Sequence, residues 1–291
     1  MDFWENAERQ AALNVYLYTV KDTPKRGEQT AGVRLIDFVL EEGGLCAAVW
    51  EDDKGNISVV FRGTGQNEWV DNGVALSGTR GKNIYYTYDP PGVYRAPCDY
   101  ASPAQVQALN WFNKMAHRYA WGEQDHITLS GHSKGGNKAQ FIAIHSDLAD
   151  VCYSFDGQGF SPEALACFSK MQAFEKRRKK IYSLSSDNDF VNVLGYRLMP
   201  PQNIFFFEAP MGEKNAVHYH LPQAILDERG HLRPQSVQGR LSLAAESLSN
   251  EVMALPPRRR RYITEGIMHL FQHHIDNEKD DILEELKRLL Q

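Results

Sequence analysis

The sequence predicts an α/β fold with a mostly parallel central sheet and helices on both faces. Two observations predict it. Strand-like and helix-like segments alternate between residues 102 and 184, and a glycine-rich turn around Ser133 follows one of the strand-like segments. Parallel neighbours in a sheet need a crossover connection, usually a helix, so this alternation implies parallel strands. At 291 residues, the chain is long enough to form one large α/β unit.

Three strand-like segments precede the alternation, at Val33–Phe38, Leu45–Trp50 and Ile57–Phe61. The last two are joined by the acidic, glycine-containing turn Glu51–Asn56, which is typical of a hairpin. The stretch Ser77–Asp99 is rich in Gly, Pro and Tyr and is too long for a simple connection. Such a loop often forms a lid or a pocket rim, so we expect a lid here, or otherwise a packed hairpin.

The alternating region begins at Ser102-Pro103, which is a good helix start because Ser is a favoured N-cap and Pro is favoured at the first helical position. The expected elements are a helix to Tyr119, strand 127–129, helix 138–145, strand 151–155, helix 162–179, and strands 181–184 and 204–207. Three helices are then expected, at 236–255, 262–274 and 280–290. We therefore expect residues 1–235 to form the main domain, and residues 236–291 to be a helical carboxy-terminal segment packed on the same domain.

Composition and charge limit the classes of molecule that the protein is expected to bind. A formal net charge of −5 argues against a general affinity for nucleic acid or anionic membranes, so a small-molecule substrate is expected. The amino terminus MDFWENAERQ lacks the basic and apolar regions of a secretory signal, and no apolar run approaches the ~18 residues that span a bilayer. The four cysteines contain no C-x-x-C pair, which favours reduced thiols. We expect a cytoplasmic protein with no transmembrane segment, and the sequence leaves the protein partner unknown.

The turn around Ser133 has the spacing Gly131-x-Ser133-x-Gly135. Glycines two residues on either side of a Ser allow a sharp strand-to-helix turn that exposes the hydroxyl as a nucleophile. A turn of this composition can also join a strand to a helix without doing chemistry. A nucleophilic Ser needs a base, a carboxylate that orients the base, and N–H donors for the oxyanion. In α/β-hydrolases the acid and the His follow the Ser along the chain.

Five separated stretches resemble the class 3 lipase group of α/β-hydrolases. They are SVVFRGT (58–64) with the following EW and D at 68–69 and 71, ITLSGHSKGGNKA (127–139), YSFDGQGFSPE (153–163), SSDNDFVNVLG (185–195) and VHYH (217–220). The closest resemblance is to a lipase-like family of unassigned function from intracellular bacterial proteins, with a G-H-S-K-G-G-N elbow. It extends over roughly Asn14–Arg229. It implies an α/β-hydrolase fold.

The resemblance also implies a catalytic triad. It makes Ser133 the nucleophile, Asp189 the acid, and His220 or His218 the base. We favour His220 because it lies immediately before an apolar run, as the base of the family does. We favour Asp189 over Asp187 because Asp189 begins a D-x-V pattern.

The oxyanion donors implied by the resemblance are the backbone N–H groups of Thr64 and Lys134, and no cofactor or metal is implied. Lys134 departs from the Leu or Met that lipases often carry after the Ser. Its ammonium could reach solvent from the first helical turn, or could favour an acidic group in the substrate. We expect Asp71 to support the oxyanion loop and His132 to have a hydrogen-bonded packing role, pointing away from Ser133.

The sequence therefore predicts a serine esterase or lipase-like hydrolase that acts on a small-molecule ester or a lipid through an acyl-enzyme. An alternative is a catalytically idle α/β-hydrolase that serves as a lipid, small-molecule or protein binding module. A third possibility is that the carboxy-terminal helices form a protein-interaction platform.

Overall fold

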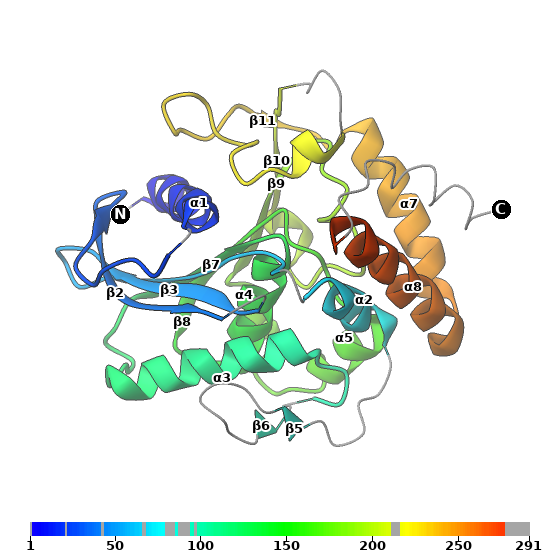
Figure 1. Ribbon diagram of the computed structural model, residues 1–291, viewed down its shortest axis with the longest axis horizontal. Coiled ribbons are helices and arrows are strands. Elements are labelled where there is room, and N and C mark those ends of the chain that lie inside the picture. Colours follow the sequence, from blue (N-terminus) through cyan, green and yellow to red (C-terminus); the bar gives the residue numbers. More distant parts are fainter. Residues whose placement is uncertain are drawn as a thin grey trace.

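The computed structural model describes residues 2–20, 22–41, 44–65, 68–78, 85–86, 94–95, 98–210 and 216–276. Over these residues, a nine-stranded sheet runs through the centre of the molecule in the order β1-β2-β3-β4-β7-β8-β9-β10-β11 (Figure 1). Its strands are β1 (Gln29–Thr30), β2 (Val33–Leu40), β3 (Cys46–Glu51), β4 (Ile57–Phe61), β7 (Ile127–His132), β8 (Ala149–Phe155), β9 (Ile181–Ser186), β10 (Ile204–Phe207) and β11 (Gln235–Ser236). β5 (Tyr85–Tyr86) and β6 (Tyr94–Arg95) pair separately.

The five central strands from β4 to β10 are parallel, whereas the strands on either edge pair antiparallel. The parallel centre coincides with the region of alternating segments, and the expected hairpin joins β3 to β4. The α/β fold expected from the sequence is confirmed. Because parallel strands end at the same edge of a sheet, the loops after β4, β7, β8 and β9 are brought together there.

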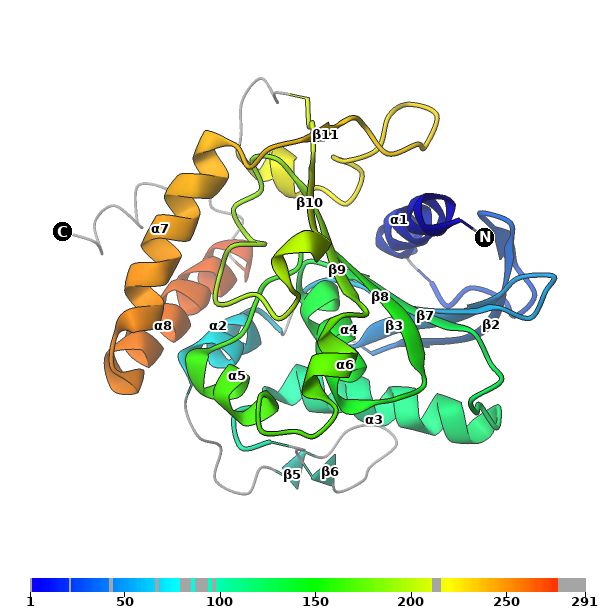
Figure 2. The ribbon, with the colours of Figure 1, turned by 180° about the vertical axis from the view of Figure 1, so that it is seen from behind.

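Helices cover both faces of the sheet (Figures 1 and 2). They are α1 (Phe3–Thr19), α2 (Trp69–Ser77), α3 (Pro103–Arg118), α4 (Lys134–His145), α5 (Pro162–Phe168), α6 (Phe174–Arg178), α7 (Arg240–Ala254) and α8 (Pro257–Asp276), with 3₁₀ turns η1 (Pro201–Asn203) and η2 (Ala216–His220). α1 lies alone on one face, and α3 and α4 pack on the other. The sheet thus divides the core into two layers.

The layer under α1 is partly polar. Asp2 is the N-cap of α1, and its side chain accepts the Trp4 N–H in a capping box. Leu13 and Leu17 are buried against β2, β3 and β4, but Gln10 and Asn14 are buried on the same side of the helix and bond to Ser58 and Ser130 of the sheet. These polar residues interrupt the apolar pattern of the helix, and α1 is absent from the helices predicted by the sequence.

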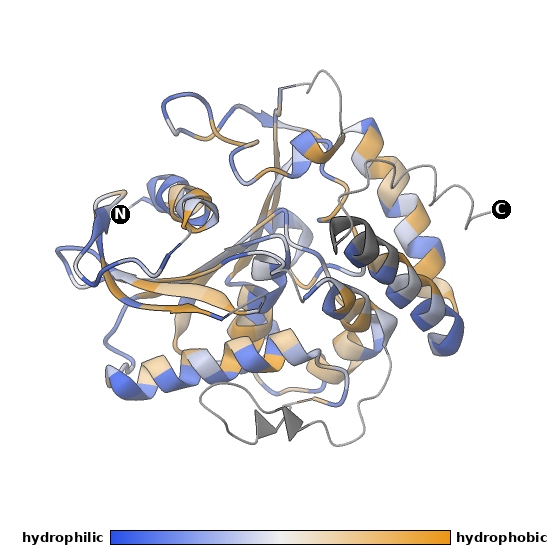
Figure 3. Cartoon of the chain, in the orientation of Figure 1, coloured by the Kyte–Doolittle hydropathy of each residue, from blue (hydrophilic) through white to orange (hydrophobic). Residues whose placement is uncertain are grey.

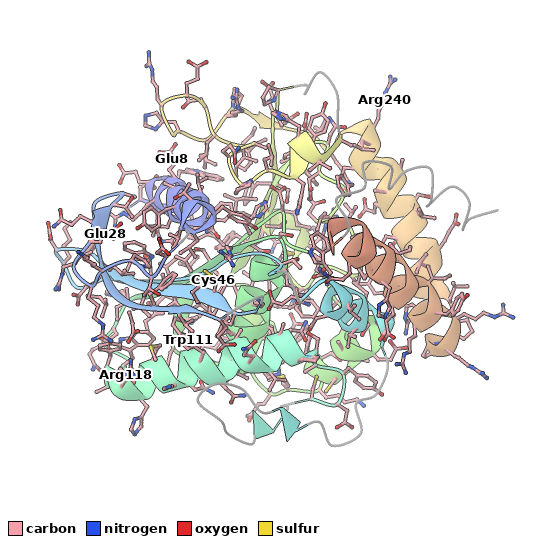
Figure 4. All side chains as sticks on the ribbon, in the orientation of Figure 1. Glu8, Glu28, Cys46, Trp111, Arg118 and Arg240 are labelled. Carbon is pink, nitrogen blue, oxygen red and sulfur yellow. The ribbon has the colours of Figure 1, made fainter. Side chains whose placement is uncertain are left out.

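The other layer is apolar. α3 and α4 contribute Phe112, Phe141 and Ile142 to a core that includes Leu129 of β7, and all four side chains are fully buried. Burying a Phe or Leu side chain contributes roughly 1.5–3 kcal/mol each. Figure 3 shows the alternation of apolar and polar residues along α3 that this packing requires. In Figure 4, Cys46 lies inside the molecule, whereas Arg118 and Arg240 lie at its edges.

Two expectations about helices were wrong in detail. The helix expected over 162–179 is two helices, α5 and α6, separated by a turn at Ser169–Ala173. α4 begins at Lys134 rather than Lys138, so Gly135 and Gly136 lie in its first turn. α2 is a further helix that the sequence did not predict.

Of the carboxy-terminal helices, α8 packs beside α2, and α7 contacts α8 (Figure 1). A stretch of four arginines, at 258–261, lies at the start of α8, and the side chain of one of them, Arg260, is buried. Arg260 is 1% exposed. Its guanidinium pairs with Glu163 of α5 and donates to the Ser77 carbonyl over 3.0 Å. A Cβ on Gly73 of α2 would lie 2.6 Å from the Thr264 carbonyl oxygen, so α2 and α8 touch through their backbones.

Several expectations fall on other parts of the chain. Most of the suggested lid at Ser77–Asp99, and the helix at 280–290, lie outside the described residues. No helix among the described residues is both long and apolar enough to cross a membrane. All four cysteines are free thiols.

Candidate active site

Ser133 occupies a strained turn between β7 and α4. Its φ of +58° and ψ of −125° are unusual for a residue with a side chain. Glycine is required on both sides of the turn because the backbones approach closely. A Cβ on Gly131 would lie 2.2 Å from the Gly135 carbonyl carbon, and a Cβ on Gly135 would lie 2.0 Å from the Phe61 carbonyl oxygen. The turn therefore has the geometry of a nucleophile elbow.

A hydrogen-bonded chain leads from this hydroxyl to a buried carboxylate. His220 Nε2 lies 2.9 Å from Ser133 Oγ, and His220 Nδ1 lies 2.7 Å from Asp189 Oδ1. Asp189 follows β9 and is fully buried. Its Oδ2 accepts the N–H groups of Val191 (3.1 Å) and Asn192 (2.6 Å). With His220 Nδ1, the carboxylate has three nitrogen partners.

The other two candidates lie apart from this chain. Asp187 is held through its backbone: its N–H bonds to the Phe207 carbonyl, and its carbonyl accepts the Gly239 N–H. His218 is half-buried on η2, and its carbonyl accepts the Leu221 N–H. The structure therefore brings Ser133, His220 and Asp189 together, and it brings neither Asp187 nor His218 into the same chain of hydrogen bonds.

The two expected oxyanion donors flank Ser133. A Cβ on Gly63 would lie 3.3 Å from Ser133 Cβ, so the loop that carries Thr64 passes directly beside the nucleophile. The Thr64 hydroxyl accepts a 3.0 Å hydrogen bond from Asn72 Nδ2. Lys134 is the first residue of α4, where backbone N–H groups have no partner within the helix and the helix dipole favours negative charge.

The side chain of Lys134 does not reach solvent, so this expectation was wrong. It is fully buried, and its ammonium lies 3.2 Å from the Asp71 carbonyl oxygen and 3.5 Å from Asp71 Oδ2. Burial lowers the pKa of Lys134, and the Asp71 charge opposes this shift. Asp71 also accepts the Ala104 N–H. The ammonium is thus engaged by the protein, which removes the argument that it selects an acidic substrate.

A second buried lysine lies one helical turn further along α4. Lys138 is fully buried and its Nζ lies 2.6 Å from Glu68 Oε1. Glu68 Oε2 accepts the Gly65 N–H over 2.8 Å, so this carboxylate ties the loop after Thr64 to the helix. Two lysine–carboxylate pairs, at Glu68 and Asp71, therefore hold the chain that follows Gly65 against α4.

His132 belongs to a second set of polar groups beneath the base. It is 2% exposed, and its ring centroid lies 4.8 Å from that of His220. Tyr18 is 41% exposed overall, but its hydroxyl points inward and lies 2.8 Å from His132 Nδ1. The same hydroxyl receives the Gly63 N–H. The expected packing role of His132 is observed, but the ring lies against the base rather than away from the site.

Asp156, at the end of β8, completes this set. It is 1% exposed, its Oδ1 accepts the Ser186 N–H over 2.9 Å, and its Oδ2 lies 3.8 Å from His132 Nε2. Burial, and then the nearby charge of Asp189, raise the pKa of Asp156 well above its usual range. Burial lowers the pKa of His132. These shifts favour the neutral form of both groups.

His132, Asp156 and His220 could in principle bind a metal ion, since one ligand atom of each lies within 4.8 Å of the others. Both ring nitrogens of His220 already contact Ser133 or Asp189. A metal bound here would therefore compete with the hydrogen-bonded chain from Ser133 rather than assist it.

Sequence reasoning missed four of the polar residues around Ser133: Tyr18, Glu68, Lys138 and Asp156. Lys138 carried a usable signal, because it follows Lys134 by one turn in a helix that crosses the core, where an unpaired cation is costly. Asp156 lies in the stretch YSFDGQGFSPE (153–163), between a strand-like segment and a glycine. Tyr18 gave no signal, because its role depends on where α1 packs.

Residues 86–195 match the model of a family described as Mbeg1-like. This is shorter than the resemblance over Asn14–Arg229 that the sequence suggested. A search of curated proteins gives no match.

Solved structures with similar folds include three fungal enzymes. The Lip2 lipase from Yarrowia lipolytica is 17% identical, with 86% of this chain and 91% of that chain covered and a TM-score of 0.49. A structure described as a fungal lipase is 14% identical, with coverages of 84% and 88% and a TM-score of 0.47. A triacylglycerol lipase from Penicillium expansum is 10% identical, with coverages of 83% and 96% and a TM-score of 0.43. With TM-scores below 0.5, these similarities assign no residue role or substrate to this chain.

The turn at Ser133 follows a central parallel strand, which is where an α/β-hydrolase places its nucleophile elbow. The family match over residues 86–195 includes this turn. The chain has an α/β-hydrolase fold and resembles the lipase-like members of that fold.

Proposed function

We propose that this protein is a serine hydrolase that cleaves carboxylic esters, including lipid esters, through an acyl-enzyme. The observation that carries the proposal is the continuous chain from Ser133 Oγ to His220 Nε2, at 2.9 Å, and from His220 Nδ1 to Asp189 Oδ1, at 2.7 Å. Nucleophile, base and orienting carboxylate at hydrogen-bonding distance are the arrangement that activates a serine for acyl transfer.

In the proposed mechanism, Ser133 Oγ attacks the ester carbonyl while His220 Nε2 accepts its proton. Asp189 stabilises the resulting imidazolium and keeps the ring in the tautomer whose Nε2 is free to accept. The N–H groups of Thr64 and Lys134 stabilise the oxyanion, a contribution of typically 10²–10³-fold in rate for one donor. His220 then protonates the leaving alcohol, and water, activated by the same imidazole, releases the acid and frees Ser133.

The experiment that tests the function is active-site labelling with a fluorophosphonate, read by intact mass. We expect one adduct on the parent protein and none on Ser133→Ala, because the phosphorus atom needs an activated serine oxygen. Ser186 is a matched control, since it is another buried serine at the end of a central strand, and Ser186→Ala should keep the adduct. A folded parent protein that gives no adduct, or an adduct that persists in Ser133→Ala, would contradict the proposal.

We also propose that residues 236–291 form an extension of the hydrolase domain. The buried Arg260, its pairing with Glu163, and the backbone contact of α8 with Gly73 support this. α2 carries Asp71 and Asn72, which contact Lys134 and Thr64. Removing the helices after Leu255 would therefore disturb the candidate active site as well as any partner surface, so truncation would not separate a binding role from catalysis.

Free thiols at all four cysteines support a reducing compartment such as the cytoplasm.

A further inference from the structure

Two carboxylates, not one, lie at the base of the proposed triad. Asp156 follows β8 and Asp189 follows β9, and these strands are parallel neighbours. The carboxyl ends of parallel neighbours meet at one edge of the sheet, so both side chains reach the same place. Asp156 also has a φ of +47°, which is uncommon for a residue other than glycine and implies that the surrounding structure holds it in this position.

One oxygen of Asp156 is fixed and the other faces the imidazoles. Oδ1 accepts the Ser186 N–H, while Oδ2 lies 3.8 Å from His132 Nε2, beyond hydrogen-bonding distance. One oxygen of Asp156 and one ring nitrogen of His220 lie within 4.8 Å of each other. A small movement of the imidazole would bring Asp156 into contact with the base.

The two carboxylates differ in how well their charge is compensated. Asp189 has nitrogen partners on both oxygens: two backbone N–H groups on Oδ2 and His220 Nδ1 on Oδ1. Asp156 is as buried as Asp189, but its hydrogen-bond partners are one backbone N–H, from Ser186, and the side chain of Ser185. Burial, and then the nearby Asp189, raise the pKa of Asp156, which favours the neutral form of Asp156.

We propose that Asp156 is a second positioning acid for His220. It lies beside Asp189 and can orient the imidazole when Asp189 carries no charge. The inference rests on the proposed function, because it concerns the base of the same triad. It involves no covalent step: Asp156 releases its proton to solvent and accepts the His220 N–H. The titratable groups that face Asp156 are Asp189, His132 and His220, with Tyr18 beyond His132.

The test compares Asp189→Ser with the double variant Asp156→Asn plus Asp189→Ser, using fluorophosphonate labelling rates between pH 6 and 10. Ser is chosen because it leaves room for the ring to move, and because its hydroxyl accepts hydrogen bonds from the loop. We expect Asp189→Ser to lose about 10²-fold at the upper end of this range, rather than the ~10⁴-fold that loss of a triad acid costs without a substitute. Its rate should rise with pH as Asp156 ionises. The double variant should be slower by a further ~10²-fold, without that rise.

Asp187→Asn is the matched control, since it removes a carboxylate from the same loop without touching the chain from Ser133. Equal rates for the single and double variants at every pH would overturn the inference. A folded parent protein that is not labelled would instead overturn the proposed function, so the two failures are distinguishable.

A second measurement covers the case in which Asp189→Ser does not fold. When the labelling rate of the parent protein is measured against pH, the fall at acid pH reports protonation of His220. A charged neighbour would shift the pH of this fall, which is the acid limb of the profile. With Asp156 neutral, Asp156→Asn should leave this limb in place. A move of the limb to lower pH in Asp156→Asn would show that Asp156 is already charged beside Asp189, and it would overturn the inference.

Discussion

The two sides of Ser133 are stabilised by different kinds of interaction. On the side of the oxyanion loop, Lys134 and Lys138 are fully buried, and each contacts its own carboxylate. On the side of the base, the Tyr18 hydroxyl bonds to His132 Nδ1, and Asp156 Oδ2 lies 3.8 Å from His132 Nε2. One side therefore consists of paired full charges, and the other side of polar groups whose pKa shifts favour their neutral forms.

This difference predicts how the stability of each side responds when one side-chain group is removed. A buried ion pair contributes little net stability compared with an apolar pair, but a buried charge that has lost its partner is very costly. A neutral buried group that loses a hydrogen bond costs much less. The oxyanion side should therefore be sensitive to single substitutions and tolerant of matched double ones, whereas the base side should respond mainly to pH.

The largest effect is expected for Lys138→Met, which leaves the Glu68 charge buried without its cation. We expect a loss of about 3–5 kcal/mol in the free energy of unfolding, measured by urea denaturation at pH 7.5. Adding Glu68→Gln should recover more than half of this loss, because the amide keeps an acceptor for the Gly65 N–H and removes the charge.

The exposed pair Arg34–Glu51 provides the control for this measurement. Arg34→Ala should cost less than about 1 kcal/mol, because solvent screens the pair. If Lys138→Met costs no more than Arg34→Ala, the buried pair does not anchor the oxyanion loop as described above.

A smaller effect, and an increase rather than a decrease in the free energy of unfolding, is expected for Asp156→Asn. Folded Asp156 keeps its proton at a pH where the unfolded chain has released it, since burial and the Asp189 charge raise its pKa. The folded state therefore binds more protons above about pH 4, and its stability falls as pH rises, by at most ~1.4 kcal/mol per pH unit. Asn does not titrate. Asp156→Asn should be more stable than the parent at pH 7.5, and the difference should shrink toward pH 5.

Urea midpoints at the two pH values measure this difference, with Asp53→Asn as the control for loss of an exposed carboxylate. A variant that is less stable than the parent at pH 7.5, or a difference that does not change with pH, would show that Asp156 is ionised in the folded protein.

The comparison also explains how much the sequence could predict. The parallel centre of the sheet follows from alternating segments, and Ser133, Asp189 and His220 each lie in or beside a local motif. These features depend on short stretches of chain. The partners of Lys134 and Lys138 depend instead on where α2 packs, and α2 is a short helix that contains Gly73 and is covered by α8.

The contacts on the side of the base were even harder to predict from the sequence. Tyr18 contacts His132 only because α1 lies across the sheet, and α1 places Gln10 and Asn14 on its buried side, where an apolar stripe would have revealed the helix. Pairs of residues more than a hundred positions apart leave no local pattern when their contacts are polar. For this reason Ser133, His220 and Asp189 could be predicted to lie together, but the groups that surround them could not.

The smallest effect is expected for Tyr18→Phe, which removes one hydroxyl from the base side. That hydroxyl bonds to His132 Nδ1 and receives the Gly63 N–H, so it links the group under the base to the loop beside the nucleophile. Loss of a neutral hydrogen bond should lower the free energy of unfolding by about 0.5–1.5 kcal/mol. If the link also holds the loop in place, the fluorophosphonate labelling rate should fall severalfold more than that of Tyr16→Phe, a control on the same helix whose hydroxyl bonds to Glu28 at the surface. Equal labelling rates for the two variants would mean that the two sides of Ser133 are held independently, and that the oxyanion loop depends on its lysine–carboxylate pairs alone.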